Sequence, residues 1–290
     1  PLTLLSIREG TEIAIVEMGA NHIGEIAELS ALAKPNYGMI TNIGRAHIEG
    51  FGSLEGVRKG KGELYQAIRQ SGGHLFVNAE DPTLVHLADN YGKATYYSQK
   101  NSFNVTEIKA QEVEGSLQIS FQWENQDYSE RMNLYGDYNV PNILAALNIG
   151  YHFQISPPKA LKALARYIPK NSRSQRLKTE SNEVYLDAYN ANPSSMEHAL
   201  KAFAKVDAQK KVIILGDMFE LGMESDDLHQ SIANLANDLF DNIILVGKHF
   251  DRVLSDHMKY LTTDDLYAHL AEKPFGGATI LLKGSRGMAL

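Results

Sequence analysis

The sequence predicts an α/β protein with a mostly parallel sheet and a small antiparallel part, followed by a smaller, doubly wound unit. Three observations support this fold class. In the first part of the chain, apolar runs of strand length alternate with helical patterns. Strict alternation of apolar residues from Leu117 to Trp123 then indicates an antiparallel strand. Beyond Asn182 the alternation of strands and helices resumes.

Cap and turn signals place the elements of the first part. Ser53 and Asp81 are candidate N-caps, and glycines at 72, 73 and 92 end the helices that follow them. The predicted elements are a buried strand at Glu12–Met18, a helix at Gly24–Ala33, a strand at Tyr37–Thr41, a helix after Ser53, a strand at His74–Val77 and a helix from Pro82.

The same logic places the remaining elements. They are strands at Leu117–Trp123 and Tyr128–Leu134, helices at Val140–Tyr151 and Pro158–Tyr167, strands at Val184–Asp187, Lys211–Leu215, Asn242–Val246 and Thr279–Leu282, and helices from Pro193 and near Leu228. The polar segment Lys170–Asn182 is interpreted as a linker. We therefore expect one domain at residues 1–170 and a second at residues 171–290.

Composition narrows the function classes. The net charge of −7 gives no electrostatic footprint for nucleic acid, although acidic side chains can bind Mg²⁺ and the phosphates that accompany it. The chain has no cysteine, which suits a reducing compartment, so we expect a cytoplasmic protein. No apolar run reaches transmembrane length. Because the chain begins with Pro1 and runs almost at once into a strand pattern, we expect it to come from a larger protein.

A lysine lies on the apolar face of the helix after Ser53. Lys61 follows Val57 by four residues and precedes Ile68 by seven, whereas Lys59 points nearly the opposite way. A lysine on the buried face loses hydration, which lowers its pKa unless it is paired or its amine reaches solvent. Spacing leaves two interpretations open: a lysine that reaches solvent at the helix end, or a desolvated amine.

Polar side chains follow several predicted strands. Glu17 ends the first strand, Asn42 and then His47 follow the second, and Asp187 ends the first strand of the second domain. Ligands of open parallel sheets bind beyond the carboxyl ends of the strands. Each residue alone has a structural explanation, but Glu17 and His47 near Lys61 favour a divalent metal site, with Mg²⁺ or Mn²⁺ preferred to zinc. The segment GFGSLEG is interpreted as a turn.

The chain also resembles a known family, the Mur ligases. The matching stretches are PLTLL, EMGANHIGEIAEL, TNIGRAHIEGFGSLEGVRKGKGEL, NAEDP, GDYNVPNILAAL, DAYNANPSSM, LGDMFELGMESDDLH and LLKGSRGMAL, and they run through the whole chain in the order of the family. Within the family, the resemblance is greatest to the ligases that join D-Ala-D-Ala to UDP-N-acetylmuramoyl-tripeptide. It implies a central ATPase domain followed by a Rossmann-like ligase domain.

The resemblance also implies roles for individual residues. Lys61 would be carboxylated to a carbamate that completes a metal shell with Glu17 and His47, and Asn42 would lie on the substrate side. The implied ATP-binding residues are Asn139 and Asn142 near the adenine, Arg173 or Arg176 at the phosphates, and Asp187 at the ribose or the metal. The implied substrate-binding residues of the C-terminal part are Asp217, Glu220, His229, Lys283, Ser285 and Arg286.

The implied chemistry is formation of an amide at the expense of ATP, through an acyl phosphate, by a monomer that needs Mg²⁺. This sequence departs from the family in having no G-x-x-x-x-G-K-[ST] loop, which binds the β- and γ-phosphates. We therefore expect the chain to be a fragment that ligates poorly on its own.

Three alternatives to this function are considered. Another ligase of the same superfamily, such as a folylpolyglutamate synthetase, would use glutamate in place of D-Ala-D-Ala. A non-catalytic binding module would keep the fold without turnover. A dinucleotide-dependent oxidoreductase is disfavoured, because no predicted strand leads into a G-x-G-x-x-G turn.

Overall fold

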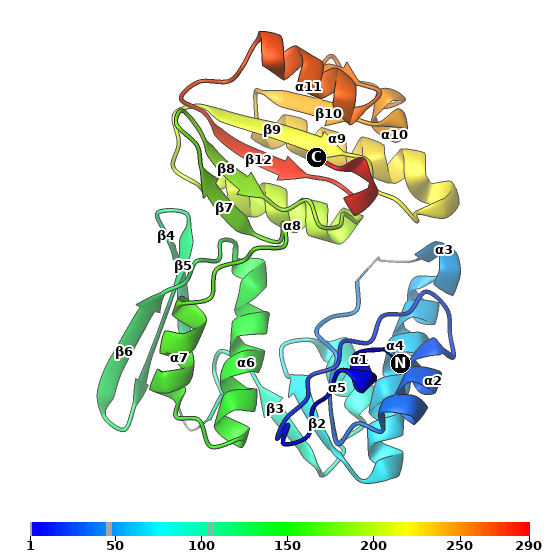
Figure 1. Ribbon diagram of the computed structural model, residues 1–290, viewed down its shortest axis with the longest axis vertical. Coiled ribbons are helices and arrows are strands. Elements are labelled where there is room, and N and C mark those ends of the chain that lie inside the picture. Colours follow the sequence, from blue (N-terminus) through cyan, green and yellow to red (C-terminus); the bar gives the residue numbers. More distant parts are fainter. Residues whose placement is uncertain (1, 45–47, 104, 106) are drawn as a thin grey trace. The chain divides into compact units, whose positions relative to one another are not determined.

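The computed structural model describes residues 2–44, 48–103, 105 and 107–290 of the chain. Contacts within the chain divide it into two compact units, residues 1–98 and residues 99–290. Both units combine helices with strands (Figure 1), as the sequence predicts. Within the described residues, no helix is long and apolar enough to cross a membrane.

The first unit is built on a three-stranded parallel sheet of order β1-β2-β3. Its elements are α1 (Leu2–Leu5), α2 (Glu25–Ala33), β1 (Tyr37–Met39), α3 (Ile48–Phe51), α4 (Leu54–Ser71), β2 (His74–Asn78), α5 (Pro82–Ala88) and β3 (Ala94–Tyr97). The predicted caps are present: Ser53 Oγ accepts a hydrogen bond from Gly56 N, and Asp81 Oδ1 accepts one from Thr83 N.

The strand predicted at Glu12–Met18 is wrong. Residues 13–20 lie in neither a helix nor a strand, and Ile13 and Ile15 are 54% and 91% exposed. A strand is stable only when a neighbour accepts its backbone hydrogen bonds. No described strand pairs with this segment. Its apolar run indicates β propensity, but a strand also requires a pairing partner, which the run does not predict.

In the second unit, an antiparallel sheet of order β4-β5-β6 packs against α7, which in turn contacts α6. Its elements are β4 (Lys109–Val113), β5 (Ser116–Trp123), β6 (Gln126–Arg131), η1 (Asp137–Asn139), α6 (Val140–His152) and α7 (Pro157–Ala165). Alternate residues of β5, among them Leu117, Ile119 and Phe121, are buried. The predicted antiparallel pair is therefore confirmed.

A six-stranded sheet of order β11-β10-β9-β12-β8-β7 forms the rest of the second unit. Its elements are β7 (Gln175–Lys178), β8 (Glu183–Leu186), α8 (Pro193–Ala204), β9 (Lys211–Gly216), η2 (Gly222–Glu224), α9 (Ser225–Leu239), β10 (Ile243–Val246), α10 (Lys248–Asp251), β11 (Met258–Tyr260), α11 (Thr263–Glu272), β12 (Thr279–Lys283) and η3 (Arg286–Met288). Only β7 runs antiparallel to its neighbour within this sheet.

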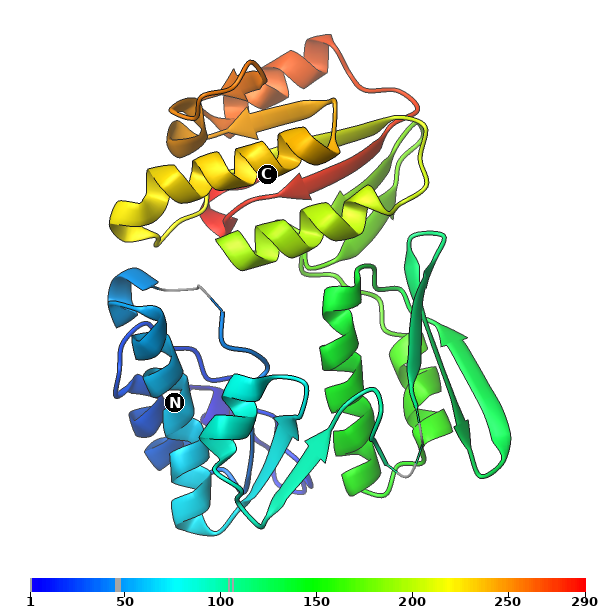
Figure 2. The same ribbon diagram turned by 180° about the vertical axis from the view of Figure 1, so that it is seen from behind.

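Helices cover both faces of this sheet (Figure 1 and Figure 2), which makes it doubly wound as predicted. In β9, Ile213 and Leu215 join the core formed with α8 and α9, whereas Val212 and Ile214 join the core that includes Leu266 of α11. This two-residue period is expected of a strand that is buried on both faces. Packing on both faces holds each strand of the sheet in place. It therefore also determines the positions of the polar residues that follow the strand ends.

The interpretation of Lys170–Asn182 as a linker is wrong in part, because β7 lies inside it and pairs with β8. The exposed edge strand carries mostly polar side chains, and a polar edge strand has the composition of a loop. The helices α1, α3, α10 and α11 and the strands β3, β4 and β11 were not predicted.

Candidate functional site

The helix α4 carries Lys61 on its inward face, as its spacing predicts. Val57, Tyr65 and Ile68 are fully buried on this face, and Lys61 is partly buried beside them, while Lys59 is exposed. Lys61 Nζ donates a hydrogen bond to the backbone oxygen of Asn42, at 2.9 Å. Burial lowers the pKa of the Lys61 amine below its usual value, because desolvation disfavours the charged form.

Two glycines allow this helix to pack closely against α3. A Cβ at Gly56 would lie 2.1 Å from the backbone oxygen of Phe51, and one at Gly60 would lie 2.4 Å from the ring of Phe51. The interpretation of GFGSLEG as a turn is right only for Gly52 and Ser53, which join α3 to α4; the residues on either side are helical, and Gly56 serves the close helix–helix contact. Packing of Phe51 against the same helix helps to fix the face that presents Lys61.

Of the other residues predicted around Lys61, Glu17 and Asn42 are exposed. Glu17 is exposed in a segment without regular structure, so it does not end a strand as predicted. Asn42 lies three residues beyond β1 with an exposed side chain, and its backbone oxygen is the group that binds Lys61. His47 lies outside the described residues.

The described residues do not by themselves form a Mg²⁺ site. Among them, no group of three or more His, Cys, Asp or Glu side chains could hold a metal ion. The protonated Lys61 amine donates a hydrogen bond and therefore offers no lone pair to a cation.

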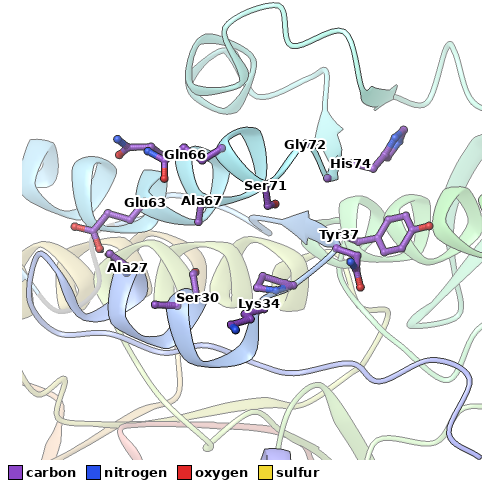
Figure 3. Close-up of a pocket in the computed structure, with 15 residues that line it drawn as sticks. Ala27, Ser30, Lys34, Tyr37, Glu63, Gln66, Ala67, Ser71, Gly72 and His74 are labelled. Atoms are coloured by element: carbon purple, nitrogen blue, oxygen red, sulfur yellow. Dashed lines mark hydrogen bonds between the residues drawn. The ribbon is translucent and has the colours of Figure 1, made fainter.

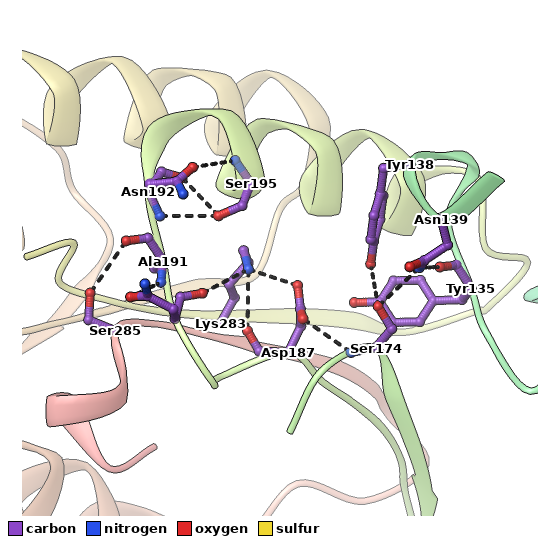
Figure 4. Close-up of polar contacts among 11 residues, drawn as sticks. Tyr135, Tyr138, Asn139, Ser174, Asp187, Ala191, Asn192, Ser195, Lys283 and Ser285 are labelled. Carbon is purple, nitrogen blue, oxygen red and sulfur yellow. Dashed lines mark hydrogen bonds and ion pairs between the residues drawn. The ribbon is translucent and has the colours of Figure 1, made fainter. Parts of the chain in front are cut away.

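The second unit gathers polar residues at the carboxyl ends of three adjacent strands, β9, β12 and β8. Lys283 at the end of β12 is 2% exposed, and its Nζ donates to Asp187 Oδ2 at 2.7 Å (Figure 4). The same amine donates to the backbone oxygens of Asp187 and Asn190, both at 3.3 Å. A buried ammonium with a carboxylate and two carbonyls is fully paired, so Lys283 fixes the DAYNAN segment to the sheet.

Asn139 and Asp187, both predicted to bind ATP, are joined through Ser174. Asn139 is buried, and its Nδ2 donates to Tyr135 O at 2.8 Å and to Ser174 Oγ at 3.1 Å (Figure 4). Ser174 N in turn donates to Asp187 Oδ1 at 3.1 Å. Asn142, which is exposed, donates to Asn139 Oδ1 at 3.5 Å. The structure therefore brings these three predicted residues into one hydrogen-bonded chain.

The two arginines that the sequence could not separate have different surroundings. Arg176 forms an ion pair with Glu183 and also donates to Glu114 O at 3.3 Å, so β7 holds its guanidinium against the sheet. Arg173 is exposed and lies over the ring of Tyr189, with 3.9 Å between its Cζ and the ring centroid. Arg173 is therefore the more accessible of the two to an anionic ligand.

Asp217 and His229 hold the loop that follows β9. Asp217 is 3% exposed, and its carboxylate accepts hydrogen bonds from His249 N at 3.0 Å and Phe250 N at 2.9 Å. His229 is completely buried; its Nε2 accepts from Met218 N at 3.0 Å, so its Nδ1 is the nitrogen that donates to Ser225 O at 2.7 Å.

This bonding pattern requires a neutral imidazole at position 229, because Nε2 can accept a hydrogen bond only when it carries no proton. Burial lowers the pKa of His229, the same direction that the hydrogen bonds require. Both ring nitrogens bind backbone atoms, so a substrate could reach His229 only if one of these bonds broke.

The KGSR segment continues the cluster beyond Lys283. Ser285 is buried; its Oγ accepts from Phe219 N at 2.9 Å, and its N donates to Asp217 O at 3.0 Å. Arg286 and Glu220 are exposed, and Glu220 has a positive φ of 63°. The predicted residues of the C-terminal part thus divide into buried ones, which fix the loops, and exposed ones, which can meet a ligand.

Two residues of the cluster were not assigned a role from the sequence, namely Ser174 and Tyr189. Ser174 lies in the segment interpreted as a linker, where a serine among polar residues gives no signal. Tyr189 belongs to DAYNANPSSM, but a partly buried tyrosine after a strand is ordinarily a packing residue. Hydrogen bonds from Ser174 N to Asp187 Oδ1 and from Tyr189 N to Ser172 O, next to the pairing of β7 with β8, bring both residues into the cluster.

A pocket of about 980 Å³ lies in the first unit, between the C-terminal halves of α2 and α4 and the first residues of β1 and β2 (Figure 3). Its lining includes Lys34, Tyr37, Glu63, Gln66 and His74. None of the residues predicted from the sequence lines it. Because it lies where the strands begin, it is at the opposite end of the sheet from the predicted ligand-binding edge.

Comparison with known protein families places both parts of the chain. The Mur ligase middle domain matches residues 1–150, and the domain described as "Mur ligase, glutamate ligase domain" matches residues 172–286. The UDP-N-acetylmuramoyl-tripeptide–D-alanyl-D-alanine ligase of Bacillus subtilis strain 168 is 33% identical over 308 residues, which cover 100% of this chain and 65% of that protein. The chain thus spans about two thirds of the length of this curated relative.

Solved structures agree with this fold. MurF from Acinetobacter baumannii superposes with a TM-score of 0.83 at 26% identity, over 98% of this chain and 64% of that chain. MurF ligase from Thermotoga maritima, solved in complex with ADP, gives a TM-score of 0.84 at 23% identity, over 99% of this chain and 67% of that chain. With the middle-domain match alone covering more than half of its residues, the chain belongs to the Mur ligase family.

Proposed function

We propose that the protein is an ATP-dependent ligase that joins D-Ala-D-Ala to UDP-N-acetylmuramoyl-tripeptide, a step of peptidoglycan precursor synthesis. The observation that carries this proposal is the Bacillus subtilis relative, whose 33% identity extends over the whole chain and whose name states this reaction. The ADP complex of the Thermotoga maritima neighbour supports a nucleotide site in the same fold.

In the proposed reaction, a carboxylate oxygen of the tripeptide attacks the γ-phosphorus of ATP, and ADP leaves. The product is an acyl phosphate. The amine of D-Ala-D-Ala then attacks the acyl carbon and loses a proton, and inorganic phosphate leaves as the amide bond forms. The main barrier is repulsion between the carboxylate and the phosphates, so cationic groups at the site accelerate the first step.

The strand-end cluster of the second unit is the proposed nucleotide side of the site. Asn139, Asn142 and Asp187 would contact the nucleoside, and their common chain of hydrogen bonds supports a shared role. Arg173 would contact the phosphates, which is supported by its exposure and by the engagement of Arg176 with Glu183.

The proposed substrate-binding residues are Asn42 in the first unit and, separately, six residues of the second unit. Exposed Glu220 and Arg286 would contact the substrates, while the buried residues would shape the loops that carry them. These buried residues are Asp217, His229, Lys283 and Ser285. The proposal divides the chain into a central domain at residues 1–170 and a ligase domain at residues 171–290.

A carbamate at Lys61 is the proposed modification of the first unit. A neutral amine adds CO₂ and releases a proton, and the lowered pKa of Lys61 increases the neutral fraction. The carbamate would replace an ammonium with two oxygens, which are ligands that Mg²⁺ accepts. Glu17 and His47 are the proposed further ligands. We also propose that the protein acts in the cytoplasm as a monomer.

The test is a ligation assay with the full-length protein that contains this chain. It is supplied with ATP, Mg²⁺, UDP-N-acetylmuramoyl-tripeptide and D-Ala-D-Ala, and both phosphate release and the mass of the product are measured. We expect phosphate release only when all substrates are present, with a product heavier by one D-Ala-D-Ala unit less water.

The competing functions give different results in the same assay. Because the C-terminal match carries the name of a glutamate ligase domain, glutamate replaces D-Ala-D-Ala in a parallel reaction. Product formed with glutamate alone would assign the protein to another ligase of the superfamily. Binding of nucleotide without phosphate release under any combination would identify a non-catalytic module.

A further inference from the structure

One tyrosine of the second unit holds two arginines. The Cζ atom of Arg173 lies 3.9 Å from the centroid of the Tyr189 ring, and that of Arg286 lies 5.6 Å from the same centroid. Arg173 precedes β7, whereas Arg286 follows β12, so the two guanidiniums come from segments far apart in the sequence. Their common contact is the ring that follows β8, the strand between β7 and β12.

The backbone around this ring is held from both sides. Tyr189 N donates to Ser172 O at 3.1 Å, in the segment that carries Arg173. On the other side, Lys283 Nζ donates to Asn190 O at 3.3 Å, from the strand that leads into Arg286. The ring therefore cannot shift without disturbing the two segments whose arginines it contacts.

Both arginines lack an anionic partner within the described part of the chain, and both are exposed. Three other arginines of the second unit do have one: Arg131 pairs with Glu114, Arg176 with Glu183 and Arg252 with Asp226, whereas exposed Arg166 has none among the described residues. Two like charges on one ring repel each other, and the ring quadrupole offsets that repulsion only in part. A bound anion would neutralise both.

Stacking suits the arginines to such an anion. A guanidinium that lies on an aromatic face keeps its N–H groups directed outward in its own plane, where they can donate in pairs to phosphate oxygens. Stacking also restricts two long side chains that would otherwise lose rotamer freedom only on binding. The ring thus prepares both donors before the ligand arrives.

We propose that Tyr189 is a positioning residue, which stacks Arg173 and Arg286 so that both guanidiniums bind one polyphosphate anion. This inference rests on the proposed ATP-dependent function, in which the polyphosphate belongs to the nucleotide, and it assigns Arg286 to the nucleotide phosphates in place of the substrate side. Tyr189 itself need not touch the ligand. Its role is exerted through the two arginines, and the aromatic ring, not the hydroxyl, is the part that matters.

The experiment measures binding of inorganic tripolyphosphate and of ATP to the full-length protein by calorimetry, and KM for ATP in the ligation assay. Tyr189→Leu removes the ring, and Tyr189→Phe keeps it. Tyr167→Leu, at an exposed tyrosine outside the cluster, controls for the substitution, and Arg166→Ala controls for the loss of a surface charge. Thermal unfolding verifies that each variant is folded. If Tyr189→Leu does not fold, Tyr189→Gln is used in its place.

We expect Tyr189→Leu to weaken tripolyphosphate binding and to raise KM for ATP about five- to tenfold, with kcat changed less than about twofold. Tyr189→Phe and the two controls should stay within about twofold of the unchanged protein. In a background of Arg173→Ala with Arg286→Ala, Tyr189→Leu should cause no further loss, because the ring then has nothing to orient.

Three results would overturn the inference: tripolyphosphate binding that is independent of the ring, a Tyr189→Leu loss that persists in the background without the arginines, or no tripolyphosphate binding at all. Ring-dependent tripolyphosphate binding without ligation would support the inference while contradicting the proposed function. Ligation that is insensitive to Tyr189→Leu would support the function and contradict the inference.

Discussion

Two lysines, one in each unit, show how differently the same side chain can be used. Lys283 is 2% exposed and donates to a carboxylate and two backbone oxygens. Lys61 is partly buried and donates to one backbone oxygen, and desolvation lowers its pKa. The carboxylate of Asp187 forms an ion pair with Lys283, whereas Lys61 has no such partner among the described residues.

The difference teaches that burial alone does not identify a reactive amine. A buried ammonium with an anionic partner is stable in its charged form, so it neither loses a proton easily nor reacts with CO₂. An amine that is desolvated without an anion is destabilised in its charged form and moves towards the neutral one. Partner chemistry therefore separates a structural lysine from a candidate nucleophile.

The largest effect is expected at Lys283. Lys283→Met removes one member of a buried ion pair and leaves the Asp187 carboxylate without its cation, so the free energy of unfolding should fall by about 3–5 kcal/mol. Urea unfolding of the second unit, followed by circular dichroism, measures the change. Lys162→Met, at an exposed lysine of α7, is the matched control and should change stability by less than about 0.5 kcal/mol. A Lys283→Met variant as stable as the control would show that the pair is not structural.

Lys61 should behave in the opposite way. Lys61→Met should leave the stability of the first unit within about 1 kcal/mol, because the hydrogen bond that Lys61 makes among the described residues is to a backbone carbonyl at the surface. Ligase activity of the full-length protein should nevertheless fall about 10²–10³-fold, the usual effect of removing one charge-stabilising group. Lys59→Met, on the exposed face of the same helix, is the control.

Carbon-13 NMR with labelled bicarbonate tests the modification directly. A carbamate signal is expected in the unchanged protein and in Lys59→Met, and it should be missing from Lys61→Met. If the signal persisted in Lys61→Met, the carbamate would belong to another amine. If the protein had full ligase activity but gave no carbamate signal, Lys61 would not need to be carboxylated for the reaction.

These contrasts also show what the sequence could predict. Helical spacing was sufficient to place Lys61 on the inward face, because the periodicity of α4 is determined by its own residues. The carboxylate partner of Lys283 could not be predicted, since Asp187 is 96 residues away and meets it only when β8 pairs with β12. Long-range pairing is the information that a single sequence lacks.

The same limit explains the error at Glu12–Met18. Apolar residues at this segment predicted a buried strand, but its side chains are largely exposed and no described strand pairs with it. β propensity is a property of the residues, whereas a strand is a property of two segments. The cap residues Ser53 and Asp81 were easier to predict, because each acts within three residues of itself.

A smaller effect is expected from pH at His229. Its pKa is lowered in the folded protein, chiefly by burial, so the folded form holds a neutral ring while the unfolded form titrates near 6.5. The stabilisation is complete above about pH 6.5 and is lost as the pH falls from there through the lower folded pKa, at no more than about 1.4 kcal/mol per pH unit. The groups around the ring are Asp217, Asp226 and His249.

Urea unfolding between about pH 8 and pH 5 measures this dependence. His229→Asn keeps an N–H donor near Ser225 O without a titrating ring, so its stability should fall less steeply below about pH 6.5. His198→Asn, at an exposed histidine of α8, should retain the slope of the unchanged protein. Equal slopes in all three proteins would mean that His229 does not control the pH dependence of the second unit.

The smallest effect is expected at the helix cap that precedes Lys61. Ser53 Oγ accepts from Gly56 N at 3.1 Å, and Ser53→Ala removes this bond at a cost of about 1 kcal/mol. Because α4 is one element of a small unit, the loss should appear locally, as about fivefold faster hydrogen exchange at the first amides of α4. Glycine is tolerated at N-caps, so Ser53→Gly should lower the free energy of unfolding by only a few tenths of a kcal/mol. If Ser53→Ala also lowered carbamate formation at Lys61, the first turn of the helix would help to hold the amine in its desolvated position. If carbamate formation were unchanged, the packing of Val57, Tyr65 and Ile68 alone would hold it there.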